Sequence, residues 1–316
     1  MAPRDLTSKP HPILNHKAFL ALVLGGVAIG FSPIFVKLAD VGPTASAFWR
    51  VTLALPLLYF WMAREKTNTP DSPPPSKRGY KFLFLCGFYF ALDLVFWHWS
   101  VQFTTVANAT LLSNMMPAFV AIGAFFIFKE RLGRIFYLGL FLSVLGAGFL
   151  AGNSFELAPG RLLGDGLAVL TAIFYAVYML AVSSLRGEFS TVIVMFWTGL
   201  FAALFLGPFT FIMGESLWPT SSSGWLPLFG LGFVSQFAGQ GLIVYGLRHL
   251  PSSFGAVTLL IQPIVAAAIA WPLFGEVLGT MDFIGATVIL SGIFLARLGA
   301  KQKSNSNSDL NPNPNS

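Results

Sequence analysis

The sequence is poor in charge and in cysteine. Asp, Glu, Lys and Arg make up 10% of its 316 residues, whereas a soluble domain carries about 25%. So few charges cannot cover a water-facing surface, which excludes a soluble enzyme, a nucleic-acid-binding protein and a disordered chain. The single cysteine, Cys86, lies inside an apolar run and excludes a disulfide framework.

Motifs of energy-transducing and metal-dependent proteins are also missing from the sequence. It contains no Walker loop and no cluster of His, Cys and carboxylate residues at metal-ligand spacing. We therefore expect no cofactor, no metal and no nucleotide-binding domain. Any energy that the protein uses would therefore come from a gradient, either that of a solute or that of protons.

Apolar residues are abundant: 55% of the chain is hydrophobic, 33 residues are Phe, and the mean hydropathy is +0.72. A membrane-spanning helix needs about 20 apolar residues, and barrel strands are much shorter than the runs in this chain. We therefore predict an all-α polytopic membrane protein with ten transmembrane helices, the first of them retained and not cleaved as a signal peptide. The apolar runs lie at about residues 17–39, 43–63, 80–101, 104–128, 133–151, 164–185, 190–213, 224–247, 252–274 and 279–298.

The positive charges indicate an orientation. If the N-terminus is cytoplasmic, the cytoplasmic segments hold sixteen of the nineteen Lys and Arg residues, and only Arg161 falls in a segment on the other side. Lys and Arg concentrate in cytoplasmic loops. We therefore predict that both termini are cytoplasmic and that the protein lies in a bacterial inner (plasma) membrane.

Two segments of the chain repeat each other. Residues 117–146 and 263–292 align without a gap at nine identical positions out of thirty, where apolar composition alone gives about three. The identical pairs are Pro117/Pro263, Ala121/Ala267, Ala124/Ala270, Phe128/Phe274, Glu130/Glu276, Leu132/Leu278, Gly133/Gly279, Gly139/Gly285 and Gly146/Gly292. The sequence therefore predicts an internal duplication.

The offset of the repeat predicts its topology. An offset of 146 residues contains five predicted spans, an odd number, so the two halves must cross the membrane in opposite directions. The bases of the first segment agree, because Lys129, Arg131 and Arg134 correspond to Gly275, Val277 and Thr280 in the second. Inverted repeats are typical of secondary transporters, whose substrate sites lie at the repeat interface near the bilayer midplane.

The two repeated segments, each with a Glu-x-Leu-Gly turn, resemble the EamA-like family of the drug/metabolite transporter superfamily, and residues 47–57 (AFWRVTLALPL) resemble a second-helix segment of that family. The resemblance covers about residues 18–298. It implies a ten-helix exporter that works by alternating access, with a central cavity lined mainly by its helices 1, 3, 4, 6, 8 and 9. The expected organisation is a cytoplasmic tail (1–16), a first repeat (17–151), an extracytoplasmic linker (152–163), a second repeat (164–298) and a disordered cytoplasmic tail (299–316).

Asp93 is the main candidate for a functional residue. A carboxylate in the middle of a span costs roughly 2.5–3.5 kcal/mol on insertion scales unless it is satisfied. Tyr89, Asp93 and Trp97 are spaced at i, i+4 and i+8, so they share one helix face. The residues form either a substrate or proton site, or a polar contact that holds the bundle together.

Other polar residues within the predicted spans are candidates for substrate binding, with interhelical packing as the alternative role. These residues are Asn114, Tyr175, Tyr178, Gln236, Gln240 and Gln262. His98 is a candidate for proton coupling beside Asp93, and its alternative role is that of an interfacial hydrogen-bond donor.

Four charged residues near the span ends have mainly structural interpretations. Arg50 is a counter-ion for Asp93, a partner for a substrate carboxylate, or a side chain that snorkels to the interface, and snorkelling is slightly favoured. Lys37 is expected to anchor at the interface near Asp40. Glu130 and Glu276 precede the predicted helices at 133–151 and 279–298, and we expect each to cap the free N–H groups of the helix that follows it.

The combined features favour a secondary transporter and not an enzyme. We expect it to export small metabolites, above all amino acids and aromatic ones among them, through a central cavity. The alternatives are a carrier of phosphorylated or nucleotide-linked sugars, or a non-transporting membrane receptor or enzyme. The expected partners are a small-molecule substrate and the lipid bilayer, without nucleic acid, and the expected state is a monomer or weak homodimer.

Overall fold

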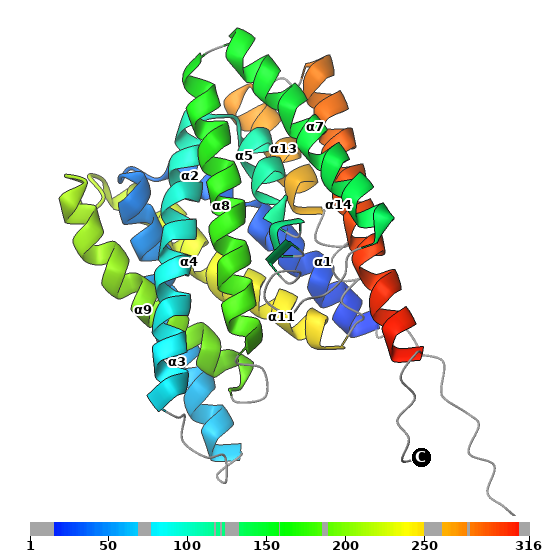
Figure 1. Ribbon diagram of the computed structural model, residues 1–316. Helices are drawn as coiled ribbons and strands as arrows, with labels where there is room; N and C mark the ends of the chain where they lie inside the picture. Colours follow the sequence, from blue (N-terminus) through cyan, green and yellow to red (C-terminus); the bar gives the residue numbers. More distant parts are fainter. Residues whose placement is uncertain are drawn as a thin grey trace, which may run out of the picture.

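The computed structural model describes residues 16–68, 77–116, 118–120, 122–123, 133–157, 159–184, 189–249, 261–276 and 279–309 (Figure 1). The described chain is helical and contains no β-sheet, which confirms the predicted fold class. Its elements are α1 (His16–Gly30), α2 (Ser32–Leu38), α3 (Pro43–Asn68), α4 (Lys77–Phe103), α5 (Val106–Ser113), α7 (Arg134–Leu157), α8 (Pro159–Ser184), α9 (Thr191–Ile212), the 3₁₀ turn η1 (Ser222–Gly224), α10 (Trp225–Phe229), the π-helix η2 (Gly230–Gly239), α11 (Gln240–His249), α13 (Ile261–Phe274) and α14 (Thr280–Asp309).

Six helical segments are long and apolar enough to cross a membrane. They coincide with six of the predicted spans, and three shorter apolar helices, at Arg134–Gly146, Ile261–Phe274 and Thr280–Leu295, coincide with three more. The predicted run at 104–128 begins with α5 and continues beyond the described residues.

The outside of the bundle is apolar. Phe141, Phe211 and Leu226 are 63%, 67% and 75% exposed. Monomeric soluble proteins rarely expose large contiguous apolar patches. The hydrocarbon of a membrane is the environment that matches this surface.

The helices cross between two faces of the bundle (Figure 1). We call the face where α1 begins and α14 ends the terminal face, and the opposite one, where α2, α4, α9 and α13 end, the distal face. Because α7 runs towards the distal face and α14 runs back, these helices of the two halves are antiparallel.

The interface between α7 and α14 has the symmetry of the repeat. A Cβ atom on Gly146 would lie 2.7 Å from the backbone N of Ile289 and 2.8 Å from the carbonyl O of Gly285. A Cβ atom on Gly292 would lie 2.5 Å from the N of Ser143 and 2.6 Å from the O of Gly139. Each contact maps onto the other by the offset of 146 residues, so the two helices meet around a local pseudo-two-fold axis.

This close approach predicts a large difference between two glycine substitutions. Gly292→Leu forces the α7 and α14 backbones apart, and overpacking of this kind costs about 1–3 kcal/mol. Gly166→Leu is the control, because a Cβ atom there meets nothing within 4 Å. We expect Gly292→Leu alone to lower the melting temperature of the purified protein. Equal melting temperatures for the two variants would contradict the close packing.

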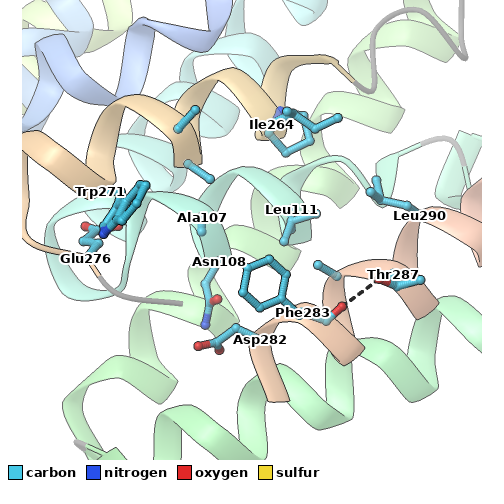
Figure 2. Close-up of a pocket in the computed structure, with 14 residues that line it drawn as sticks. Ala107, Asn108, Leu111, Ile264, Trp271, Glu276, Asp282, Phe283, Thr287 and Leu290 are labelled. Atoms are coloured by element: carbon cyan, nitrogen blue, oxygen red, sulfur yellow. Dashed lines mark hydrogen bonds between the residues drawn. The ribbon is translucent and has the colours of Figure 1, made fainter. Parts of the chain in front are cut away.

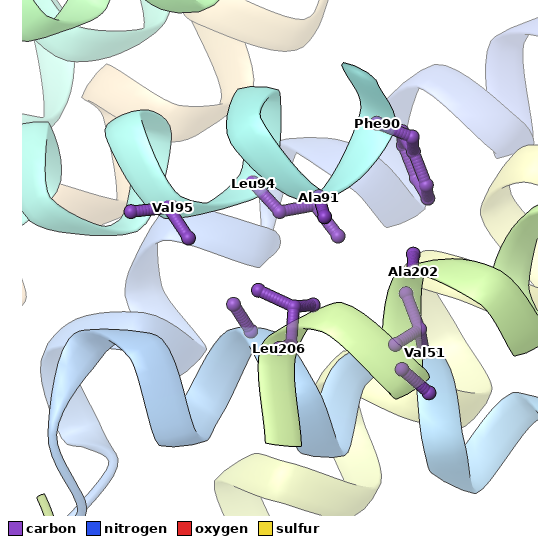
Figure 3. Close-up of a cluster of buried hydrophobic side chains, with 9 residues drawn as sticks. Val51, Phe90, Ala91, Leu94, Val95, Ala202 and Leu206 are labelled. Atoms are coloured by element: carbon purple, nitrogen blue, oxygen red, sulfur yellow. The ribbon is translucent and has the colours of Figure 1, made fainter. Parts of the chain in front are cut away.

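A core of small and medium side chains joins three helices beside the centre of the bundle. One buried cluster takes its side chains from α3, α4 and α9 (Figure 3); they are Ala47, Val51, Phe90, Ala91, Leu94, Val95, Ala202, Ala203 and Leu206. The close approach of α4 to α9 depends on Gly87, where a Cβ atom would lie 2.4 Å from Cβ of Phe201. This packing holds the inward-facing sides of α3 and α4 in place.

Two irregular stretches aim side chains into the bundle. The first predicted span is broken at Phe31 into α1 and α2, because the ring of Pro33 clashes with the carbonyl of Ile29 in a continuous helix. In the second half, ten residues form the π-helix η2. Such π-helical turns are rare and often lie at functional sites.

Candidate functional site

Cavities lined by several helices occur at two kinds of place within the described part of the bundle. One, of about 510 Å³, lies on the side, between α5, α13 and α14. Two others, of about 140 and 260 Å³, lie inside and share four lining residues. Joined, the two inner cavities fall within the roughly 300–1,000 Å³ range of small-molecule sites.

The lateral cavity is unsuited to a polar metabolite. Figure 2 shows Ile264, Trp271, Phe283 and Leu290 around it, and Trp271 and Phe283 are 65% and 59% exposed. Its polar residues already have partners: Glu276 pairs with Lys37, and Asn108 and Asp282 are also engaged. The two inner cavities are therefore the candidate site.

The 140 Å³ cavity, which we call the central cavity, contains two opposite charges. It is lined by residues of α1 to α5, α8, α11 and α13, including Arg50 and Asp93. Both are almost completely buried, at 5% and 6% exposure. Buried ions that lack a partner cost several kcal/mol each. Their presence in one cavity makes this cavity the candidate site for a polar or charged ligand.

Arg50 is held rigidly by neighbours from both halves of the chain. Its Nε donates to Oε1 of Gln236 at 3.1 Å, and its Nη1 donates to Oγ of Ser32 at 3.2 Å. The guanidinium lies over the ring of Trp97, 5.4 Å from the ring centroid. The snorkelling interpretation is wrong, because Arg50 is buried and its guanidinium is hydrogen-bonded inside the bundle.

Asp93 lies on the side of α4 that faces α8 and the central cavity. Its backbone carbonyl accepts a hydrogen bond from the hydroxyl of Thr171 at 3.3 Å. Its carboxylate makes no hydrogen bond to a described residue, and no Arg50 nitrogen lies within 4.0 Å of it. The carboxylate therefore faces the central cavity as a free acceptor.

The second inner cavity leads from the central cavity towards the terminal face. Phe90, Tyr175, Gln240 and Ile243 line both cavities. The second continues past Tyr178 to Val182, near the end of α8, and to Phe189 and Thr191 at the beginning of α9. The two together form a path from the middle of the bundle towards the terminal face.

Most of the predicted site residues lie at these cavities. Asp93, Trp97, Asn114, Tyr175, Gln240 and Gln262 line the central cavity. Tyr178 and Gln236 line the second. Tyr89 lines neither inner cavity; its ring lies against that of Phe88, and Phe90 occupies the inward position instead. Arg50, which the sequence offered as a partner for a substrate carboxylate only as one of three alternatives, also lines the central cavity, as do Phe90 and Thr171, which the sequence did not assign to a site.

His98 is buried away from both inner cavities. Its Nδ1 lies 2.7 Å from Oγ of Ser46, and that hydroxyl donates its only hydrogen to the carbonyl of Pro43 at 2.8 Å. With the hydroxyl hydrogen on the Pro43 carbonyl, Nδ1 is the ring nitrogen that donates. Nε2 has no partner within the described chain. The ring joins the start of α3 to α4.

At the distal face, carboxylates of the second half cap helices of the first. The Oε2 of Glu276 accepts from the backbone N of Val106, the first residue of α5, at 2.9 Å, and the Glu276 carboxylate also pairs with Lys37. Glu215 accepts from the backbone N atoms of Thr44 and Ala45, in the first turn of α3, at 3.2 and 2.8 Å. Both contacts cross between the repeats.

Two further contacts cross at the same face. Oδ2 of Asp40 accepts from Oγ of Ser221 at 2.8 Å, and this hydrogen bond holds the pKa of the Asp40 carboxyl below its ordinary value. The indole of Trp49 donates to the carbonyl of Leu217 at 2.6 Å. We call the contacts of Lys37, Asp40, Trp49, Glu215 and Glu276 the distal latch.

The latch corrects two predictions. Glu276 does not cap the helix that follows it; α14 instead has Asp282, whose Oδ2 accepts from the N of Gly279 at 2.8 Å. Gly275 has a φ of +65°, and this turn places Glu276 against α5. Lys37 is not an anchor beside Asp40 but the partner of Glu276. Glu130 lies outside the described residues.

Comparison with known proteins identifies the family. A sequence profile of the EamA-like transporter family matches residues 16–152 and again residues 162–298. "Uncharacterized transporter YxxF" of Bacillus subtilis is 24% identical over 291 residues, 91% of this chain and 92% of that protein. "Pseudopaline exporter CntI" of Pseudomonas aeruginosa is 25% identical over 278 residues, 86% and 92% of the two chains.

A solved crystal structure shares the fold. It covers 92% of this chain and 98% of its own, with a TM-score of 0.62 at 18% identity. The double profile match, the similar lengths of the relatives and the paired α7 and α14 helices all agree with the predicted duplication. The chain belongs to the EamA-like transporter family.

Proposed function

We propose that this multi-pass membrane transporter exports small metabolites of amino-acid type by alternating access through the central cavity. The observation that carries the proposal is a buried cavity holding Arg50 and Asp93, closed at one face and extended towards the other. A relative that is named an exporter supports the direction of transport.

The distal latch supports alternating access. Each of its contacts joins a residue of the first repeat to one of the second. Between the latch and the central cavity, Val36, Trp97, Val101 and Leu228 belong to one buried apolar cluster. In the proposed cycle these contacts separate when the cavity opens towards the distal face, and the arrangement described here is the state that faces the terminal side.

The cavity chemistry favours amino acids over phosphorylated sugars. Arg50 is the single base among the described residues that line the two inner cavities. A doubly charged phosphate is usually held by several basic groups or by a helix N-terminus. A substrate with one carboxylate matches one guanidinium, and the aromatic rings of Trp97 and Tyr175 fit an apolar or aromatic side chain.

Asp93 is the residue we propose for proton coupling. Its carboxylate is free and faces the path to the terminal side, whereas His98 lines neither inner cavity. Protonation of a cavity carboxylate changes the charge available to a substrate, which is how a proton gradient can drive export.

Counterflow into proteoliposomes tests the proposed function. Liposomes loaded with an unlabelled L-amino acid should accumulate the same labelled amino acid, and liposomes loaded with sugar phosphates should not accumulate labelled sugar phosphates. Accumulation of sugar phosphates alone would favour the rival carrier. If none of the tested small metabolites gave counterflow, the proposed transport would be contradicted.

The proposed orientation has its own test. A reporter fused after Ser316 should be active if it is an enzyme that works in the cytoplasm and inactive if it works in the periplasm. The reason is that α1 begins and α14 ends at the same face of the bundle, and the cytoplasmic segments of the proposed orientation hold sixteen of the nineteen Lys and Arg residues. Activity of a periplasmic reporter at this position would reverse the orientation and the direction of transport with it.

A further inference from the structure

We infer that the central cavity recognises zwitterions, with Arg50 binding the carboxylate of the substrate and Asp93 binding its ammonium group. The inference rests on the proposed function and makes it more specific, because it requires both charges on one small molecule. Anions and cations that lack the second charge are then poor substrates.

Arg50 is suited to bind a carboxylate because it is fixed before the substrate arrives. Gln236 and Ser32 hold its Nε and Nη1, and the Trp97 ring supports its face. Its Nη2 makes no hydrogen bond to any described residue. Charge-assisted hydrogen bonds from Arg to a carboxylate are roughly twice as strong as neutral ones. Little conformational freedom is lost when a carboxylate binds to a side chain that is already ordered.

The lining that α5 contributes to the central cavity offers acceptors. Thr110 donates its hydroxyl hydrogen to the carbonyl of Val106 at 2.7 Å, and Ser113 donates its own to the carbonyl of Thr110 at 3.0 Å. Towards the cavity these two hydroxyls therefore present oxygen lone pairs. Together with the free Asp93 carboxylate, they form an acceptor-rich environment that suits an ammonium group.

The separation of the two charges supports a bridging ligand. Arg50 and Asp93 line one cavity, yet their charged atoms are more than 4.0 Å apart. A direct ion pair would satisfy both residues without a substrate. Since the protein keeps them apart, a molecule that carries both charges can satisfy both at once, whereas a singly charged molecule leaves one ion without a partner.

Substrate analogues that lack one charge test the inference. The twenty L-amino acids are compared first in counterflow, and the best of them is then compared with its N-acetyl derivative, which lacks the ammonium, and its methyl ester, which lacks the carboxylate. A hydrogen bond to a charged group is worth about 1.5–3 kcal/mol, so each derivative should exchange with about ten- to hundredfold lower apparent affinity.

A variant separates recognition of charge from general damage. In Asp93→Asn the preference for the amino acid over its N-acetyl derivative should fall to about twofold, because the ammonium loses its ionic partner. Asp282→Asn, at the lateral cavity, should keep the wild-type preference. A purely structural role of Asp93 would lower both rates equally and leave the ratio unchanged, which would overturn the inference.

The outcomes distinguish the inference from the proposed function. Exchange of the N-acetyl derivative or the ester at the rate of the amino acid overturns zwitterion recognition while leaving an exporter in place. Exchange of simple amines or carboxylic acids, without exchange of any amino acid, also overturns zwitterion recognition and leaves an exporter in place. Counterflow of none of these compounds overturns the proposed function and the inference together.

Discussion

Asp93→Asn is expected to fold and insert normally but to lower efflux of the substrate about ten- to hundredfold. The amide keeps the shape of the carboxyl group and loses its charge, and the lost charge-assisted hydrogen bond is worth about 1.5–3 kcal/mol. If transport is coupled to protons at Asp93, the variant should also lose the dependence of efflux on pH. Efflux from loaded proteoliposomes between about pH 6 and 8 measures both effects.

Two control variants are matched to Asp93→Asn. Asp282→Asn makes the same chemical change at the lateral cavity, where an amide can still accept from Gly279 as a carboxylate does, and it should transport as the wild type. His98→Gln changes the other titratable residue that the sequence indicated for coupling, and it should keep the pH dependence. Normal, pH-dependent efflux by Asp93→Asn would make Asp93 a packing residue and move the substrate path to the Gln236, Gln240 and Gln262 side.

Glu276→Ala is expected to loosen the distal face. The substitution removes both the partner of Lys37 and the acceptor for Val106 N–H at the start of α5. Loss of a helix cap costs about 0.5–2 kcal/mol. Hydrogen exchange of a peptide that covers residues 104–112 should therefore become several-fold to about thirtyfold faster, as measured by mass spectrometry on the protein in lipid nanodiscs.

Two further variants separate the two roles of Glu276, the ion pair with Lys37 and the cap of α5. Glu276→Gln keeps an oxygen that can accept from Val106 and loses the ion pair, so exchange at α5 should rise less than in Glu276→Ala. Lys37→Met removes only the cation and should resemble Glu276→Gln. Unchanged exchange in Glu276→Ala would mean that these contacts do not hold the distal face closed.

The general plan of the fold could be predicted because it depends on composition and spacing. Apolar runs of about 20 residues are sufficient to predict spans, and the offset between two similar segments is sufficient to predict an inverted repeat. The pairs Gly139/Gly285 and Gly146/Gly292, identified from the sequence, lie where α7 and α14 approach most closely.

The role of Arg50 could not be predicted from its depth in the span alone. Its position near a span end allows either snorkelling or burial, and only the rotation of α3 about its axis decides between them. A stripe of buried residues at Ala47, Val51, Ala54 and Leu58 gives that rotation. Arg50 borders the stripe, but residues 47–58 are apolar on nearly every face, so the sequence alone does not show which face is buried.

The partners of Lys37 and Glu276 depend on contacts between distant parts of the chain. They are 239 residues apart in sequence, and no local pattern relates them. The local rule that a carboxylate caps the next helix failed because Gly275 turns the chain and Asp282 takes that role at α14. The prediction for Tyr89 depended on the rotation of α4 about its axis. Phe90, the next residue along the helix, points into the inner cavities in place of Tyr89.

Accessibility of a single cysteine in the central cavity tests alternating access most directly. The protein contains one cysteine, so Cys86→Ala provides a cysteine-free background, and Ser113→Cys adds one thiol to the cavity lining. A membrane-impermeant maleimide should label it from the terminal side, saturating substrate should protect it, and Glu276→Ala should add labelling from the distal side. Two results would contradict a central pathway closed by the distal latch. One is labelling of Ser113→Cys only from the distal side while the latch residues are unchanged, and the other is labelling that a transported substrate does not slow.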